Sequence, residues 1–183
     1  MAGFLPNRGG YRKLKVYRKA EIIYDITFFF ANRFLGKGDR TIDQMIQAAR
    51  SGKQNIAEGS EASTTSRETE IKLTNVAKAS LEELLIDYTD YLRVRQLECW
   101  SQGHPRYESM RRYAASERIN SDYNDVIARL SDEETANLAI TLIQQATYML
   151  RRLIDRQQQQ FLTEGGIREQ MTRARLDYRK QNR

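Results

Sequence analysis

Apolar side chains recur at intervals of three and four residues through the middle of the chain, and this spacing restricts the fold more than any other feature. The period places those side chains on one face of a helix, so a long amphipathic helix is predicted from near Ser66 to near Leu97. Its inward residues are Leu73, Val76, Ala77, Ser80, Leu81, Leu84, Leu85, Tyr88, Tyr91 and Leu92. Only two of the 183 residues are proline, and 40% are hydrophobic and 30% charged, which favours one soluble, helix-rich domain.

Three further helices are predicted from the same kind of pattern. The first runs from about Tyr11 to Leu35. The second runs from about Thr41 to Glu58, is weakened by Gly52 and stops at Gly59. The last begins after Ser131 and runs to about Leu162. Short connections make the first three helices antiparallel neighbours, so the predicted fold is all-α, an antiparallel four-helix bundle.

The bundle is predicted to carry one insertion and two terminal segments. Residues 1–10 are a flexible N-terminus, and residues 11–164 form the bundle, with the insertion at 98–131 between its third and fourth helices. Residues 165–183 are a basic C-terminal helical extension that follows a hinge at Gly165-Gly166.

Shorter helices and solvated stretches are predicted outside the four long helices. The insertion should contain short helices around Arg106–Arg118 and Tyr123–Leu130, and the glutamine run Gln157–Gln160 should be solvated. The segment Ile167–Arg183 is expected to be a helix only if something receives three of its side chains. Those side chains are Met171, Leu176 and Tyr178.

Two helix starts carry capping signals. The segment Ser60–Ser66 is predicted to be a polar loop, and Thr65 followed by Glu68 fits a capping box at the start of the third helix. Ser131 followed by Glu134 repeats that pattern at the start of the fourth.

The second half of the first helix is apolar on several faces. A surface helix needs only one apolar stripe, so the extra surface must be covered by something. A subunit interface in a homo-oligomer is the favoured reading, and a central position in the chain's own bundle is the alternative. The residues are Ile22, Ile23, Ile26, Phe28, Phe29, Phe30 and Phe34.

Positive charge gathers at the two ends of the chain. Residues 1–20 carry six cations and no acid, and residues 167–183 carry a net +4, so the rest of this +6 chain is net −4. Basic ends often meet a polyanion, although they can also simply be solvated. Tyrosines lie among the cations and could stack on unpaired bases. The candidate nucleic-acid-binding residues are Arg12, Lys13, Lys15, Arg18, Lys19, Arg173, Arg175, Arg179 and Lys180.

Two motifs carry a family resemblance. The turn Asn55-Ile56-Ala57-Glu58-Gly59-Ser60 and the helix Ala77-Lys78-Ala79-Ser80-Leu81-Glu82-Glu83-Leu84 resemble the four-helix-bundle family first noted in proteins encoded by intervening sequences of bacterial large-subunit rRNA genes. That family also includes the accessory protein of diversity-generating retroelements. The resemblance covers about residues 11–97 and 132–160, and the motifs are moderately specific.

The resemblance implies a particular assembly and partners. Family members are similar in forming a ring-like pentamer, and the retroelement accessory resembles a basic barrel that binds a reverse transcriptase and nucleic acid. This chain departs from the pattern in its 98–131 insertion, its basic extension and its net acidic body, which puts a nucleic-acid-binding lumen in doubt.

No arrangement of residues in the sequence indicates an enzyme, a metal or a cofactor. Glu58 and Glu82 match the family motifs and could form an acid/base or metal pair, but a structural role is favoured because the only histidine, His104, lies outside the bundle. Cys99 and His104 are too few for a zinc site and are read as an apolar plug beside Trp100. The hydroxyls of 60–66 could bind phosphate, but capping explains them without a ligand and is the favoured reading.

The location expected from the sequence is the cytoplasm, with no membrane contact. A single cysteine fits a reducing compartment, and neither a signal peptide nor a membrane-spanning run is evident.

Two functions remain open from the sequence. The favoured one is a non-enzymatic, homo-oligomeric bundle that binds nucleic acid through its basic ends, with RNA slightly preferred. The alternative is a protein-interaction scaffold, in which the first helix and the insertion hold another protein such as a polymerase.

Overall fold

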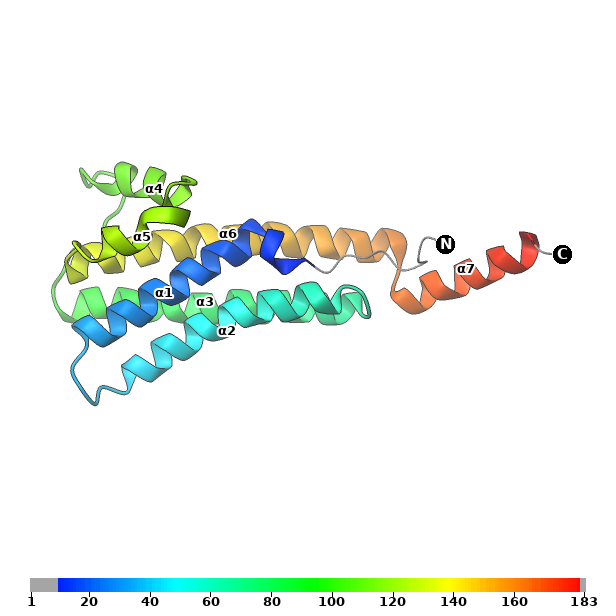
Figure 1. Cartoon of the computed structure of the whole chain (residues 1–183), viewed down its shortest axis with the longest axis horizontal. Coiled ribbons are helices and arrows are strands. Elements are labelled where there is room, and N and C mark those ends of the chain that lie inside the picture. Colours follow the sequence, from blue (N-terminus) through cyan, green and yellow to red (C-terminus); the bar gives the residue numbers. More distant parts are fainter. Residues whose placement is uncertain (1–9, 182–183) are drawn as a thin grey trace.

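The computed structural model describes residues 10–181, and every regular element within them is a helix. Four long helices lie side by side and alternate in direction along the chain (Figure 1). They are α1 (Lys15–Phe34), α2 (Thr41–Ala62), α3 (Arg67–Val94) and α6 (Asp132–Glu164). The shorter elements are the 3-10 helix η1 (Tyr11–Lys13), α4 (Tyr107–Ala115), α5 (Ile119–Ile127) and α7 (Ile167–Gln181). The predicted all-α class is confirmed for this part of the chain, whereas nearly all of the predicted flexible segment 1–10 lies outside the described residues.

The four long helices share one apolar core, in which α1 and α3 each pack against α2 and α6. The Phe30 ring of α1 meets the rings of Tyr88 and Tyr91 in α3, with centroids 5.0 and 4.7 Å apart. The buried Tyr88 hydroxyl donates to Thr27 Oγ1 at 3.0 Å, and the Thr27 hydroxyl in turn donates to the Ile23 carbonyl at 2.7 Å. An unpaired buried hydroxyl would be costly, so these two bonds allow a tyrosine to lie at the centre of the core.

The apolar surface of α1 is largely covered by the chain itself. Ile23, Ile26 and Phe30 are fully buried in the shared core. The insertion covers a second side of α1 through α5, where the Tyr123 hydroxyl donates to Asp25 Oδ2 at 2.5 Å. Phe28 is still 53% exposed. The reading in which α1 is central to its own fold accounts for most of this apolar surface, and a subunit interface on α1 stays a prediction.

Glycine has a different role in α2 from the predicted one. Gly59 does not stop the helix, which continues to Ala62. Both Gly52 and Gly59 are buried and face α3: a β-carbon would lie 2.7 Å from Leu81 Cδ2 at the first and 3.3 Å from Leu73 Cβ at the second. The missing side chains thus let α2 and α3 approach closely, and the contact stabilises a helix that glycine would otherwise weaken.

The connection between α2 and α3 is shorter than the predicted loop at 60–66. Ser63, Thr64 and Thr65 donate their hydroxyls to carbonyls of the last turn of α2, and Ser66 caps α3 by accepting from the Thr69 amide at 3.1 Å. The capping box predicted for Thr65 and Glu68 is therefore wrong, because the cap lies one residue later.

At α6 the predicted capping box is confirmed. The Ser131 side chain accepts from the Glu134 amide, and the Glu134 carboxylate accepts from the Ser131 amide.

The packing of α3 shows that two predictions about burial are wrong, one for Gln157 and one for Val76. In the glutamine run, Gln157 is buried and donates to Glu70 Oε1 and Thr74 Oγ1, each at 3.1 Å, so this residue is a core contact between α6 and α3. Val76 was expected to face inward but is 39% exposed, because its position in α3 falls beyond the face that α2 and α6 cover.

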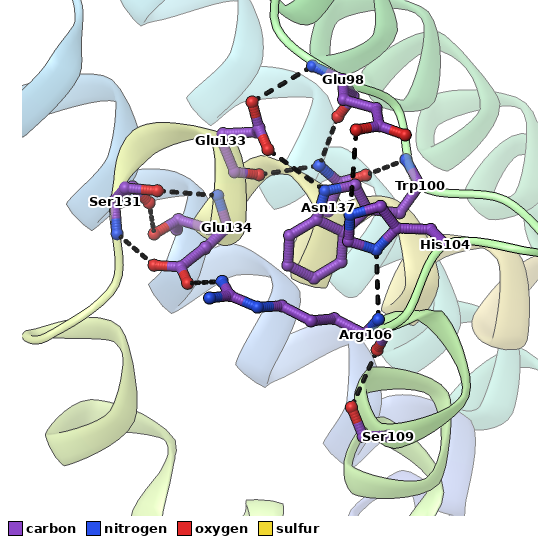
Figure 2. A network of polar contacts seen from close by, with 10 residues as sticks. Glu98, Trp100, His104, Arg106, Ser109, Ser131, Glu133, Glu134 and Asn137 are labelled. Atoms are coloured by element: carbon purple, nitrogen blue, oxygen red, sulfur yellow. Dashed lines mark hydrogen bonds and ion pairs between the residues drawn. The ribbon is translucent and has the colours of Figure 1, made fainter.

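The segment 98–131 packs on the outside of the long helices, with α4 against α6 and α5 against α1. Its entry segment is held by polar contacts (Figure 2). The Trp100 amide donates to Asn137 Oδ1 at 2.7 Å, and its indole donates to Glu133 Oε1 at 3.2 Å. Asn137 Nδ2 in turn donates to the Glu98 carbonyl at 2.8 Å. Trp100 is thus buried and fixed by a buried amide, whereas Cys99 is exposed, so the predicted apolar plug does not include the thiol.

Helix α7 extends past the end of the four long helices (Figure 1). None of its residues is buried, so within the described chain no other segment buries its side chains, and the need for a receiver stays a prediction. Met171, Leu176 and Tyr178 are 50%, 48% and 69% exposed. None of the described helices combines the length and apolarity needed to cross a bilayer.

Replacing Gly52 with alanine should lower the free energy of unfolding by about 1–2 kcal/mol, because overpacking against the fully buried Leu81 outweighs the gain in helix propensity. Urea unfolding measures the change. In a Leu81→Ala background the same substitution should become stabilising, since the obstructing side chain is gone. A loss of stability in both backgrounds would show that the α2–α3 contact is not the cause.

Replacing Asn137 with alanine should cost about 2–3 kcal/mol, because the buried Trp100 amide loses its acceptor. Asn75→Ala is the matched control, since Asn75 is exposed and its side chain likewise bonds a carbonyl four residues earlier. Equal stability loss in the two variants, measured by chemical denaturation, would contradict the role given to Asn137.

Candidate functional site

A groove of about 860 Å³ lies between α1, the α4–α5 segment and α6. Five cations line it: Lys13 of η1, Lys15, Arg18 and Lys19 of α1, and Arg111 of α4. Of the described lining residues, only Glu117 is acidic. The groove is therefore a concentrated positive region, in which four N-terminal cations lie beside the net acidic part of the chain.

The local fold explains why these cations converge. Lys15, Arg18, Lys19 and Ile22 are spaced by three and four residues, so they share one face of α1. Leu14 has an extended backbone between η1 and α1, and this break brings Lys13 to the same groove. Because α4 packs along α6, Arg111 lies on the opposite wall.

The predicted N-terminal cations differ in their contacts. Arg12 does not line the groove, and its guanidinium lies over the ring of Tyr11, 5.9 Å from the centroid. Lys15 Nζ lies 3.8 Å from Glu117 Oε1, but both side chains are at least 80% exposed, so this pair is weak. Arg18 is exposed and donates only to the Arg12 carbonyl, at 3.4 Å. Lys13, Lys15 and Arg18 are thus available to an incoming anion.

Lys19 has a structural role at the base of the groove. Its Nζ donates to the Ala114 carbonyl at 2.7 Å and to Gln145 Oε1 at 2.9 Å, which ties α1 to the end of α4 and to α6. Burial lowers the pKa of Lys19 to about 8, with the carboxylate of Glu117 acting in the opposite direction. Lys19 supports the walls of the groove, whereas its neighbours face solvent.

Sequence reasoning missed Arg111 and two tyrosines of the groove. Tyr148 of α6 is 60% exposed, and Tyr107 lies at the start of α4. Ile22, Ile119 and Met149 line the groove between the charged walls, but Ile22 and Ile119 are buried and only Met149 is partly exposed. Arg111 and Tyr148 are far from Lys15 in sequence, so only the packing of the insertion could reveal that they belong together.

The predicted C-terminal cations lie elsewhere. Arg173, Arg175, Arg179 and Lys180 are exposed on α7 and do not line the groove. Arg175 lies with Arg168, Met171 and Tyr178 along a shallow hollow on α7 itself. The two basic ends thus do not form one continuous site within the described chain.

The acidic and thiol candidates are not brought together. Glu82 pairs with Lys78 at 3.0 Å, and Glu58 is exposed on α2. His104 stacks on Trp100 with ring centroids 4.4 Å apart, and Cys99 is exposed (Figure 2 shows the surroundings of the stack). Among residues 10–181, no group of three or more histidine, cysteine or acidic side chains is placed to hold a metal ion.

Comparison with known proteins yields no matching family model, curated protein or solved structure. The resemblance carried by the turn at 55–60 and the helix at 77–84 therefore stays a prediction.

The buried Lys19 should make stability depend on pH. Its pKa in the folded state is below its ordinary value of 10.5, so between about pH 8 and 10 the unfolded chain binds more protons at this site. The free energy of unfolding should therefore rise with pH across that window, relative to a Lys19→Met variant. Urea titrations of both proteins at about pH 7 and pH 9 test this. If the difference in free energy of unfolding between the two proteins is the same at both pH values, the lowered pKa of Lys19 is contradicted.

Proposed function

We propose that this protein is a non-enzymatic nucleic-acid-binding protein whose groove between α1, α4 and α6 holds single-stranded RNA. The observation that carries the proposal is the convergence of Lys13, Lys15, Arg18 and Arg111 on a hollow that also contains exposed tyrosine. We further propose that α1, α2, α3 and α6 constitute an antiparallel four-helix bundle into which residues 98–131 are inserted.

The chemistry of the groove suits an unpaired strand better than a duplex. Lysine and arginine on both walls can contact successive phosphates, and the charge-assisted bonds of arginine suit phosphate oxygens. Tyr107 and Tyr148 offer ring faces on which bases can stack, and the partly exposed Met149 can cover a base face. A duplex hides its base faces in the stack, so these aromatic and apolar groups would gain less from it.

The exposed pair of Lys15 and Glu117 is compatible with binding. Because both side chains are solvated, little free energy is lost when Lys15 turns to a phosphate. Glu117 then disfavours more deeply seated anions, which favours a strand along the groove over a compact anion inside it.

The resemblance adds a more specific proposal, namely a homo-oligomer, with a pentamer as the implied form, that serves as a reverse-transcriptase accessory. The second candidate function is a protein-interaction scaffold without direct nucleic-acid binding. The exposed Phe28 favours it, because this ring lines a hollow with Tyr24, Phe29 and Arg33 on the outer side of α1.

Replacing Lys13, Lys15 and Arg18 with glutamine should weaken binding of single-stranded RNA. Three lost phosphate contacts should also reduce the steepness of log K against log salt by about 2. Fluorescence anisotropy with labelled single-stranded RNA, duplex RNA and DNA, at about 50 and 200 mM salt, gives both quantities. Lys19 is left intact, since its replacement would disturb the groove.

The matched control replaces Lys37, Arg40 and Arg50 with glutamine. This variant loses the same charge from exposed positions outside the groove. Equal weakening in the two triple variants would mean that only net charge matters. Binding that is unchanged in the groove variant, or absent from the native chain at the lower salt, would reject the groove and favour the scaffold.

A further inference from the structure

Helix α3 carries an apolar and acidic stripe on its solvent side. Val76, Ile86 and Val94 are 39%, 60% and 67% exposed, although large aliphatic side chains usually avoid water. Exposed Ala79, Glu83 and Asp90 fall between them at helical spacing, so all six residues share one face. We call this set the α3 stripe.

The acids of the α3 stripe are crowded. Asp87 lies half-buried beside it, and its pKa is raised first by burial and then by the charges of Glu83 and Asp90. Arg93 offsets one of these charges by pairing with Asp90 at 2.8 Å. Negative charge beside exposed aliphatic groups favours a partner that is both cationic and apolar.

Helix α7 has the complementary pattern. Ile167, Met171, Ala174 and Tyr178 are spaced by four, three and four residues and form its apolar side, which we call the α7 stripe. Arg168, Arg175 and Arg179 each follow a member of that stripe by one position, so they lie along one edge of it. Met171, Ala174, Tyr178 and two of these arginines border the same shallow hollow.

We propose that the α7 stripe of one copy of this chain docks on the α3 stripe of a second copy. Aliphatic and aromatic groups of α7 would cover Ile86 and its neighbours, and the arginine edge would face Glu83, Asp87 and Asp90. Arginine suits this contact, because its planar guanidinium binds carboxylates in a bidentate manner.

The length of α7 indicates that its binding partner is the α3 stripe of a second copy and not the α3 stripe of its own chain. A helix of 15 residues is about 22 Å long, whereas Ile86 lies 19 residues, or about 28 Å, beyond the start of α3. The Gly165-Gly166 joint is near that start, since a β-carbon on Gly166 would lie 3.1 Å from Glu68 Oε1. An α7 folded back along its own α3 would therefore end before the centre of the α3 stripe.

This contact is independent of the groove. In such an assembly each copy gives one α7 and receives another, either reciprocally in a dimer or in sequence around a ring. Arg173 and Lys180 fall on the side of α7 away from its stripe and would stay exposed.

The test compares Met171→Glu with Leu176→Glu in the full chain by sedimentation velocity. The two residues are equally exposed, at 50% and 48%, and lie on the same helix, but Leu176 falls outside the α7 stripe. We expect the native chain and Leu176→Glu to sediment as an oligomer at micromolar concentration and Met171→Glu as a monomer. A monomeric native chain, or an oligomer that survives Met171→Glu, would overturn the proposal.

A charge exchange then tests the pairing itself. One chain carries glutamate at Arg168, Arg175 and Arg179, and another carries lysine at Glu83 and Asp90. Each should be monomeric alone, since its two stripes repel, and mixing them should restore a complex because each α7 then meets an oppositely charged α3. If either chain assembles alone, or if the mixture stays monomeric, α7 does not bind this face. RNA binding is compared between Met171→Glu and Leu176→Glu, which leave every candidate nucleic-acid-binding cation in place, and should be equal in the two.

Discussion

The organisation of this protein depends on the need to bury α1 on more than one side. Its core side packs on α2 and α6, and its second side lies beneath α5. An exposed phenylalanine or isoleucine in water is costly, and the segment 98–131 covers apolar surface of α1 that the other long helices leave exposed. The groove lies where this segment meets α1 and α6, and Lys19 joins its walls at the base.

Sequence periodicity was sufficient for the long helices and insufficient for their ends and contacts. The spacing of Leu81, Leu84 and Tyr88 required an amphipathic helix, and these side chains are indeed fully buried. Gly59 looked like a stop because its helix-breaking tendency is local, whereas its close approach to Leu73 is a tertiary effect that no local rule contains. Gln157 was misjudged for the same reason, since its partners Glu70 and Thr74 belong to another helix.

For the candidate site, the sequence identified the basic residues but not how the fold arranges them around the groove. The basic run at 12–19 was visible, yet only the fold separates Lys19, whose amine is bonded to Ala114 and Gln145, from Lys15, whose amine is solvated. Arg111 could not be linked to that run, because nothing local connects it to α1. The net charge of −4 over the body was no guide either, because four of the five groove cations lie before residue 21 and only Arg111 and the single carboxylate belong to the body.

The joint between α6 and α7 determines the direction in which each face of α7 points. Gly165 adopts φ 75°, a left-handed value, and α7 starts two residues later. One residue added between the joint and the α7 stripe would turn that stripe by about 100° about its own axis while leaving the length of the arm almost unchanged. Most surface segments would tolerate one added residue. Here it would rotate the apolar side of α7, so that the same side chains would face a different neighbour.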